Sequence, residues 1–391
     1  MKIHWLGLIV VAVLCIAMDV FICHRLRRSG YRWLAWFNGA LAVLSAALVA
    51  AIAVMPLNEA STSNTMFTTG QYMLYTFFAI MAPKVLGTII YGLGRWIKQR
   101  WMTVCAFVVA ALVFVIMWWG AIITPRTLEV REVEMTFDRL PESFDGYRIV
   151  QWSDTHLGTY NGRRSIVERQ IEAINNLHPD MICFTGDLVS RETNEALPYR
   201  DLLAKLHAPD GVFSVLGNHD YDDYVHWDDE KAKTADRKAL CDLQTAAGWK
   251  LLNNSHAVIK RGNQQIIIIG TENYGDHIGD KRGNITSAYS GSRDGNFKIQ
   301  LQHNPFAWRD NTIPNSNVDL MLAGHTHAWQ IMLTLGKWRW SPASMRYPEW
   351  GGAYSEGEQQ LYVNIGTGMV GTPMRIGATP EITVITLRKK R

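Results

Sequence analysis

The chain has 391 residues, of which 48% are apolar and 19% charged, and its formal net charge at pH 7 is +4. That charge is too small to indicate nucleic-acid binding, and residues 124–391 contain no basic stripe with interleaved aromatic residues. The five cysteines do not form the framework of a disulfide-rich domain, and no Cys183–Cys241 bridge is expected because Cys183 lies in an apolar run.

The first 123 residues are mostly Ala, Val, Leu, Ile, Met and Trp. They contain four apolar stretches of roughly 20 residues, the length that crosses the hydrocarbon core of a bilayer. The predicted spans are Trp5–Cys23, Trp33–Met55, Tyr72–Gly94 and Thr103–Ile123. A cleaved signal peptide is the alternative for the first. A true span is favoured, because little positive charge precedes it beyond Lys2 and no clear small-residue cleavage site follows.

The loops between these stretches differ in basic residues, and loops rich in Lys and Arg stay in the cytoplasm. The first loop holds four arginines and the third holds Arg95, Lys98 and Arg100, whereas the second, around Pro56–Gln71, has neither Lys nor Arg. Both termini are therefore predicted to lie outside the cytoplasm. The predicted location is the cell (inner) membrane, with several spans and the soluble half extracytoplasmic.

Two charged residues lie within the predicted spans, Asp19 in the first and Lys84 near the middle of the third, beside Pro83. An ionisable side chain in a bilayer is costly and is by default a candidate for function. Three interpretations remain open: a structural Asp19–Lys84 pair, snorkelling of Lys84 beside the break at Pro83, or a role in substrate passage. A structural role is favoured over substrate passage.

The soluble half begins after Pro125 with an extended linker and edge strand over Thr127–Phe137, followed by a turn at Pro141–Gly146. Short apolar runs bounded by Gly, Asp or Asn then alternate with segments of helical periodicity, which indicates an α/β domain with one or two central sheets under helices. The predicted strands are Tyr147–Trp152, Met181–Phe184, Val212–Leu216, Ile266–Ile269, Phe297–Leu301, Val318–Leu322, Leu361–Ile365 and Ile382–Leu387.

The predicted helices of this half are Arg163–Leu177, Leu197–Leu206 and Thr234–Ala247. The chain is therefore expected to divide into a transmembrane region over residues 1–125, a linker and edge strand over residues 126–145, and a catalytic domain over residues 146–391.

Polar residues gather where the predicted strands end, which is the usual ligand-binding edge of α/β architectures. The clusters are Asp154-Thr155-His156, Gly186-Asp187, Gly217-Asn218-His219-Asp220, His303-Asn304 and Gly324-His325-Thr326-His327. Carboxylates, an amide oxygen and neutral imidazoles suit Mn, Fe or Zn, and no thiolate biases the set toward softer metals. Five of the twelve histidines fall here, so the clusters indicate a metal site.

In this order and spacing, the clusters resemble the five-block signature of the calcineurin-like metallophosphoesterases. The likeness covers about residues 129–391, including Tyr362-Val363-Asn364-x-Gly366-x-Gly368 and the closing Pro380-Glu381-Ile382 strand. It is strongest to the bacterial branch with transmembrane helices before the catalytic domain. The resemblance implies a four-layer sandwich, in which helices flank two β-sheets, and a metal-dependent phosphoric ester hydrolase.

The resemblance also implies two divalent ions, Mn, Fe or Zn. The implied ligands are Asp154, His156 and His327 for one ion, Asn218, His303 and His325 for the other, and Asp187 as the bridge. Two cations that close together can clamp phosphate oxygens and acidify a shared water for in-line attack. His219 would lie beside the phosphate, where an imidazolium supplies a proton or a positive neighbour to the leaving alkoxide.

The sequence departs from its relatives at two places. Some relatives have an Asp shortly after the bridging Asp that orients the catalytic His, but here Leu188-Val189-Ser190-Arg191 follows. Asp220 is the candidate substitute, and Arg191 either binds phosphate or caps a helix. Close relatives often have two glycines where this chain has Ala328-Trp329. Trp329 could narrow the cleft or offer a stacking or lipid-facing surface.

The stretch beyond Trp329 is aromatic, with Trp338, Trp340, Tyr347 and Trp350. Core and rim packing accounts for most of these at least as well as a role in the site. Substrate choice is predicted to depend on Ser190, Trp329 and this aromatic loop.

The function predicted from the sequence is hydrolysis of a phosphomonoester or phosphodiester outside the cytoplasm, in an envelope lipid or cell-wall precursor, by a metal-bridging hydroxide. Its expected partners are a phosphorylated small molecule or lipid and the bilayer. Some relatives cleave the pyrophosphate of a nucleotide-linked acyl sugar, but that substrate is cytoplasmic. The alternative, a non-catalytic membrane receptor or scaffold, predicts missing ligands, and none is missing. A transporter is disfavoured because the four predicted spans show no repeat.

Overall fold

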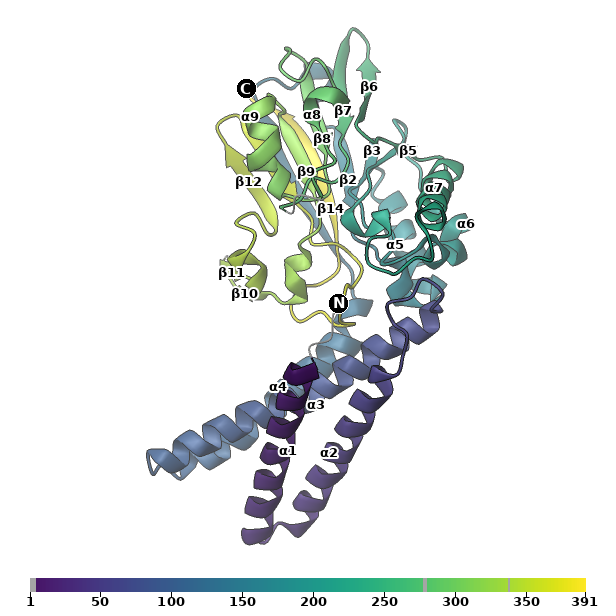
Figure 1. The fold of residues 1–391 in the computed structure, drawn as a ribbon. Coiled ribbons are helices and arrows are strands. Elements are labelled where there is room, and N and C mark those ends of the chain that lie inside the picture. The colour runs from purple at the N-terminus through teal and green to yellow at the C-terminus, as the bar shows by residue number, and fades with distance from the viewer. Residues whose placement is uncertain (1–4, 277–279, 337) are drawn as a thin grey trace. The chain divides into compact units, whose positions relative to one another are not determined.

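The computed structural model describes residues 5–276, 280–336 and 338–391 (Figure 1). The chain forms two compact units. The first comprises the residues up to Leu57 together with Met66–Ala121, and the second comprises Asn58–Thr65 and Ile122–Arg391. The connection between the second and third helices therefore belongs to the second unit.

The first unit is built from four helices, α1 (Trp5–Arg28), α2 (Arg32–Ala53), α3 (Asn64–Trp96) and α4 (Trp101–Ile122). Among the described residues, three helical segments are long and apolar enough to cross a membrane, namely Arg32–Ala53, Asn64–Trp96 and Trp101–Arg126. These overlap three of the four predicted spans. The first predicted span is helical within α1 but does not meet this criterion, so its crossing remains a prediction.

The two charges that lie within the predicted spans are paired. Lys84 Nζ lies 2.8 Å from Asp19 Oδ1, and both side chains are 9% exposed. The same carboxylate oxygen accepts a hydrogen bond of 3.1 Å from Asn38 Nδ2. The predicted Asp19–Lys84 pair is therefore confirmed, and the amide of Asn38 adds a second donor to the buried carboxylate, as a buried charge requires.

Two six-stranded sheets form the centre of the second unit. The first has the order β1-β14-β2-β3-β4-β5 and the second β12-β13-β9-β8-β7-β6. The strands of the first sheet are β1 (Glu129–Phe137), β2 (Arg148–Trp152), β3 (Met181–Phe184), β4 (Val212–Ser214), β5 (Lys250–Leu251) and β14 (Glu381–Lys389). Those of the second are β6 (Ser255–Arg261), β7 (Gln264–Gly270), β8 (Phe297–Leu301), β9 (Leu320–Ala323), β12 (Gly352–Glu356) and β13 (Gln359–Val363).

Strand direction explains where the polar clusters meet. In the first sheet β2, β3, β4 and β5 are parallel, and in the second β7, β8, β9 and β13 are parallel. The carboxyl ends of parallel strands lie at one edge of their sheet. A separate antiparallel hairpin, β10 (Leu333–Leu335) with β11 (Trp338–Trp340), lies outside both sheets (Figure 1).

The two sheets pack face to face around the largest core. Ile149 and Cys183 of the first sheet share this core with Ile299 and Leu320 of the second. The neighbouring residue Val150 points to the opposite face, since side chains alternate along a strand. That outer face is covered by α5 (Arg164–Asn176) and α7 (Glu230–Ala246), and the outer face of the second sheet by α8 (Ile285–Ala288) and the segment around α9 (Ile313–Asn315). The predicted α/β sandwich is confirmed.

The three helices predicted for the soluble half lie where they were expected, but their first and last residues differ from the prediction. α5 matches the predicted Arg163–Leu177 closely. The predicted Leu197–Leu206 helix is divided into a 3₁₀ turn at Leu197–Tyr199 and a short α6 (Arg200–Leu203). α7 begins before the predicted Thr234, since the Asp229 carboxylate caps it by accepting the Ala232 N–H at 2.6 Å.

Candidate metal centre

The backbone at the predicted ligands is unusual. Asp154, His156, Asp187, His325 and His327 all have positive φ, between 41° and 73°. Non-glycine residues in this region cost on the order of 1–3 kcal/mol each and persist where the surroundings fix them. Such strain gathers at functional sites, so its concentration on these side chains points to a function for the clusters.

One group of buried side chains comes together at the ends of β2 and β3. Its members are Asp154, His156, Asp187 and His327. His156 Nε2 lies 3.1 Å from His327 Nε2 and 3.5 Å from Asp187 Oδ2. His327 Nε2 lies 3.2 Å from Asp154 Oδ1. Every one of these four residues is buried, and one donor atom of each lies within 4.8 Å of the others.

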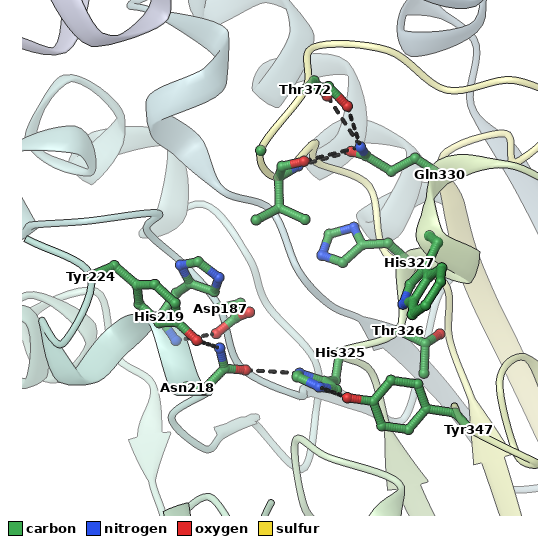
Figure 2. Close-up of a pocket in the computed structure, with 13 residues that line it drawn as sticks. Asp187, Asn218, His219, Tyr224, His325, Thr326, His327, Gln330, Tyr347 and Thr372 are labelled. Carbon is green, nitrogen blue, oxygen red and sulfur yellow. Dashed lines mark hydrogen bonds between the residues drawn. The ribbon is translucent and has the colours of Figure 1, made fainter. Parts of the chain in front are cut away.

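A second group lies beside it. His303 Nε2 is 3.0 Å from Asn218 Oδ1 and 3.2 Å from Asp187 Oδ2, while His325 Nδ1 is 2.8 Å from Asn218 Oδ1. Asn218 Nδ2 donates to the Tyr224 hydroxyl at 2.6 Å, which leaves the amide oxygen turned toward the histidines (Figure 2). Asp187 Oδ2 thus contacts a histidine of each group.

The donor set fits divalent cations. It offers carboxylate and amide oxygens and imidazole nitrogens, with no cysteine among them. Two glycines permit the close approach: a Cβ on Gly217 would collide with Asp187 Oδ1, and a Cβ on Gly324 with Asp154 Oδ2. The residues present would therefore hold a metal ion.

Burial and mutual charge set the protonation of the site. Burial raises the pKa of Asp187, but His303 and His219 outweigh it and hold that pKa well below its usual value. Burial lowers the pKa of His303, but Asp187 outweighs it and raises the pKa to about 9. Burial and the neighbouring His303 lower the pKa of His325 to about 3. Asp187 and His325 are therefore in the forms that ligate metals, an ionised carboxylate and a neutral imidazole, whereas His303 would release a proton on binding a metal.

His219 is held beside these groups by the Ser190 carbonyl. Its Nδ1–H donates to Ser190 O at 2.8 Å, and its ring stacks on Tyr224 with centroids 3.9 Å apart and planes 10° apart. Because a carbonyl oxygen only accepts hydrogen bonds, Nδ1 carries a proton. Nε2 is then the ring nitrogen that can exchange a proton with another molecule. The Ser190 hydroxyl lies 3.1 Å from His156 Nδ1, so this one residue holds two histidines.

Asp220, the predicted orienting group for His219, has other partners. Its Oδ2 accepts the backbone N–H of Asp187 at 2.8 Å and of Gly217 at 2.9 Å. Its Oδ1 accepts those of Leu188 at 2.9 Å and Val189 at 3.2 Å. The carboxylate ties together the two loops that carry Asp187 and Asn218.

Arg191 is not among the residues that line the cavity at the site. Its Nε donates to Glu195 Oε1 at 3.2 Å and its Nη2 to the carbonyl of Thr62 at 3.3 Å. Glu195 Oε2 accepts the Ser190 N–H at 2.6 Å. Burial raises the pKa of Glu195 to about 7, against the opposing effects of the Ser190 N–H and Arg191.

A cavity of about 460 Å³ opens over the metal-binding groups (Figure 2). Tyr224, Trp329 and Tyr347 give it aromatic walls, and the Tyr347 hydroxyl lies 2.9 Å from His325 Nε2. Trp329 and Tyr347 of the predicted aromatic stretch therefore line the site. Trp338, Trp340 and Trp350 do not, and Trp350 packs in a small core with Ala328.

Three residues at the site escaped the sequence analysis. Tyr224 lies in a loop without a motif and stacks on His219. Arg375 is fully buried, and its Nη2 lies 3.1 Å from His327 Nδ1. Glu195 acts through the backbone of Ser190. Glu195 and Arg375 can be recognised in the structure as buried charged residues. No local sequence pattern marks either of them.

Oxygen and nitrogen donors at the strand ends of a two-sheet sandwich, with a histidine beside an open cavity, define a metal-binding hydrolase. Residues 147–329 match the sequence profile of the calcineurin-like phosphoesterases. The chain is 34% identical over 270 residues to the uncharacterized metallophosphoesterase YkuE of Bacillus subtilis, covering 68% of this chain and 87% of that protein. The chain belongs to the calcineurin-like phosphoesterase family and is a metal-dependent phosphoric ester hydrolase.

Two further relatives are similar over shorter shares of their own length. A zebrafish (Danio rerio) transmembrane protein with a metallophosphoesterase domain is 31% identical over 299 residues, which cover 73% of this chain and 63% of that protein, just under two thirds. The UDP-2,3-diacylglucosamine pyrophosphatase LpxG of Chlamydia trachomatis is 38% identical over 113 residues, which cover 28% of this chain and 33% of that protein.

Proposed function

We propose that the chain hydrolyses a phosphomonoester or phosphodiester with two divalent ions, Mn, Fe or Zn. The observation that carries this is the position of Asp187 Oδ2, 3.5 Å from His156 Nε2 and 3.2 Å from His303 Nε2. Two cations close enough to share a phosphate repel each other unless an anion lies between them. A buried carboxylate shared by two groups of ligands supplies that anion.

The proposed ligands follow the two groups of side chains. Asp154, His156 and His327 would hold one ion, Asn218, His303 and His325 the other, and Asp187 both. When bound, the ions would neutralise phosphate oxygens and acidify the attacking water.

His219 is the proposed general acid. The Ser190 carbonyl and the stacked Tyr224 fix its ring, and Nε2, protonated in the imidazolium form, is the atom that would donate a proton to the leaving oxygen. Asp220 and Arg191, the other predicted catalytic residues, are proposed to act as positioning groups. Asp220 fixes the backbone of Asp187, and Arg191 fixes Glu195 and thereby Ser190.

We propose that the catalytic domain lies outside the cytoplasm. Asn58–Thr65 joins α2 to α3, and within the second unit Asn64 Nδ2 donates to the Gly158 carbonyl at 2.8 Å. If α3 and α4 both cross the membrane, this connection and the catalytic domain lie on one side and the α3–α4 loop on the other. That loop and its flank carry Arg95, Lys98 and Arg100, which favours the cytoplasm for it.

The proposed substrates are phosphoesters of the cell envelope, either a lipid or a cell-wall precursor. The aromatic walls of the cavity support this, as does the partial likeness to LpxG, whose name describes an acylated sugar nucleotide as its substrate. Aromatic walls bury apolar surface that a small polar phosphate does not supply.

The test is a substrate panel on the full chain purified in detergent. After metal removal and reloading with Mn, Fe or Zn, we expect hydrolysis of a phosphomonoester, a phosphodiester or a phospholipid that depends on the metal. No turnover of any of the three with a fully loaded site would refute the proposal. For topology, alkaline phosphatase fused after Arg391 should be active; a fused fluorescent protein that folds in the cytoplasm would contradict it.

A further inference from the structure

The β10–β11 hairpin has one apolar and one polar face. Leu333 pairs with Trp340 and Leu335 with Trp338, while Thr334 pairs with Arg339 between them. Directly paired residues share a face of a hairpin, and side chains alternate between faces along each strand. The four apolar residues therefore form a single face, which we call the apolar hairpin face.

This apolar hairpin face points away from the domain. Leu335 is 78% exposed, Trp338 56% and Leu333 51%. On the opposite face, Arg339 is half-buried, with its guanidinium 5.9 Å from the Trp350 ring. A hairpin in water buries its apolar face against the core and exposes its charged one. Here the arrangement is reversed, and a two-stranded hairpin is at best marginally stable in water without such cover.

Two further apolar side chains are exposed in segments that also contribute to the cavity wall. Met345 is 73% exposed, and Trp329, which lines the cavity, is 45% exposed. Trp329 and Ala328 have left-handed backbones, with φ of 44° and 52°, which cost roughly 1–2 kcal/mol per residue. Burial of Trp329 does not offset that cost, since nearly half of the residue is exposed. Its placement at the cavity rim points to an external partner.

The hairpin and the cavity wall are physically joined. The Ser341 hydroxyl, directly after β11, donates to the Ala328 carbonyl at 2.5 Å, and the Trp329 N–H donates to the Thr326 carbonyl at 2.7 Å. These bonds connect the end of the hairpin to the turn that carries His327. Whatever binds the apolar hairpin face is therefore held beside the cavity wall.

We propose that the apolar hairpin face binds the surface of the lipid bilayer that the chain's own helices enter. Trp and Leu with a charged residue behind them are the composition of segments that lie in a membrane interface. Three membrane-length helices keep a bilayer within reach, and a connection between two of them is part of the catalytic unit. The inference rests on the proposed function and narrows its substrate to phosphoesters of membrane lipids.

The physical test is quenching of tryptophan fluorescence by brominated lipid, which needs no turnover. The full chain is placed in nanodiscs of phosphatidylcholine with or without brominated acyl chains. The difference in emission between wild type and Trp338→Phe isolates Trp338. The matched control is Trp249→Phe, because Trp249 is 3% exposed inside the catalytic unit.

We expect the Trp338 emission to be largely lost in brominated discs and the Trp249 emission to be unchanged. Trp338 emission that is equally bright in both kinds of disc overturns the proposal. Cross-linked dimers under those conditions would then assign the apolar hairpin face to a second copy of the chain.

The functional test separates this inference from the proposed function. The double variant Leu335→Ser, Trp338→Ser should hydrolyse a phospholipid in discs at least about tenfold more slowly and a soluble phosphoester at the wild-type rate. Val258→Ser, on exposed β6, is the control and should change neither rate. Equal loss on both substrates, or on neither, overturns the inference while the proposed function stands. A wild-type protein that hydrolyses neither the phospholipid nor the soluble phosphoester refutes the proposed function. The fluorescence quenching then still tests whether the apolar hairpin face binds the bilayer.

Discussion

Asp220→Asn should destabilise the catalytic unit although the residue lies outside the cavity. The carboxylate accepts four backbone N–H groups, two on each oxygen, at 2.8–3.2 Å. Asparagine keeps one oxygen and presents an amide donor to the other two N–H groups. Burial and the neighbouring Asp187 raise the pKa of Asp220 to about 7, so the carboxylate is ionised above pH 7. There, hydrogen bonds to the charged group contribute about 1.5–3 kcal/mol each, and the loss of two costs about 3–6 kcal/mol.

The assay is thermal unfolding of the full chain in detergent, together with its metal content. Asp220→Asn should lower the melting temperature and the metal content together, because the four bonds of the wild-type carboxylate fix the loops of Asp187 and Asn218. The control is Asp223→Asn in the same segment, whose carboxylate pairs with Lys233 and Arg282 at the surface. Exposed pairs contribute about 0–1 kcal/mol. If both variants have the same melting temperature and the metal content of the wild type, the positioning role of Asp220 is wrong.

Three further predictions follow from the same contacts. His219→Gln should keep its metal and lower kcat by about 10²–10⁴-fold for an alkyl phosphoester but less for a nitrophenyl ester, whose leaving group needs no proton; equal losses on both would contradict an acid role. Asp19→Lys with Lys84→Asp should recover thermal stability that each single change loses by about 3–5 kcal/mol, and failure to recover it would contradict the pair. Burial raises the pKa of Glu195 from 4.5 to about 7, so its contribution to stability is full below pH 4.5 and lost as pH rises through 7. Glu195→Gln loses one of the two acceptors that bind Ser190 N–H and Arg191 Nε, but its melting temperature relative to the wild type should rise between pH 5 and pH 8. The same difference at both values would contradict this.

Much of the catalytic fold can be predicted from the sequence, because its strands are short apolar runs bounded by turn residues. The runs at Met181–Phe184 and Phe297–Leu301 coincide with β3 and β8. The short β5 and the polar β6 and β12 carry too few apolar residues to be recognised. Nor does the sequence give the order of strands within each sheet, since that depends on contacts between distant segments.

The candidate metal ligands can be predicted because a motif concentrates them on strand ends. Their supports are harder to predict. His219 is oriented by a backbone carbonyl, and any residue at position 190 supplies one. Asp220 is recognisable as a buried acid beside the motif, but its partners are backbone N–H groups that only the folded loops bring together. The reversed hairpin at β10–β11 is visible in sequence only as scattered Trp and Leu.

The most direct test of the account is the metal stoichiometry of the wild type and of Asp187→Asn, measured on the same preparations as phosphoesterase activity. The two-metal mechanism predicts two ions per wild-type chain, with fewer ions and no turnover when Asp187 no longer supplies a shared carboxylate. Asp187→Asn that keeps two ions and wild-type turnover would contradict the two-metal mechanism.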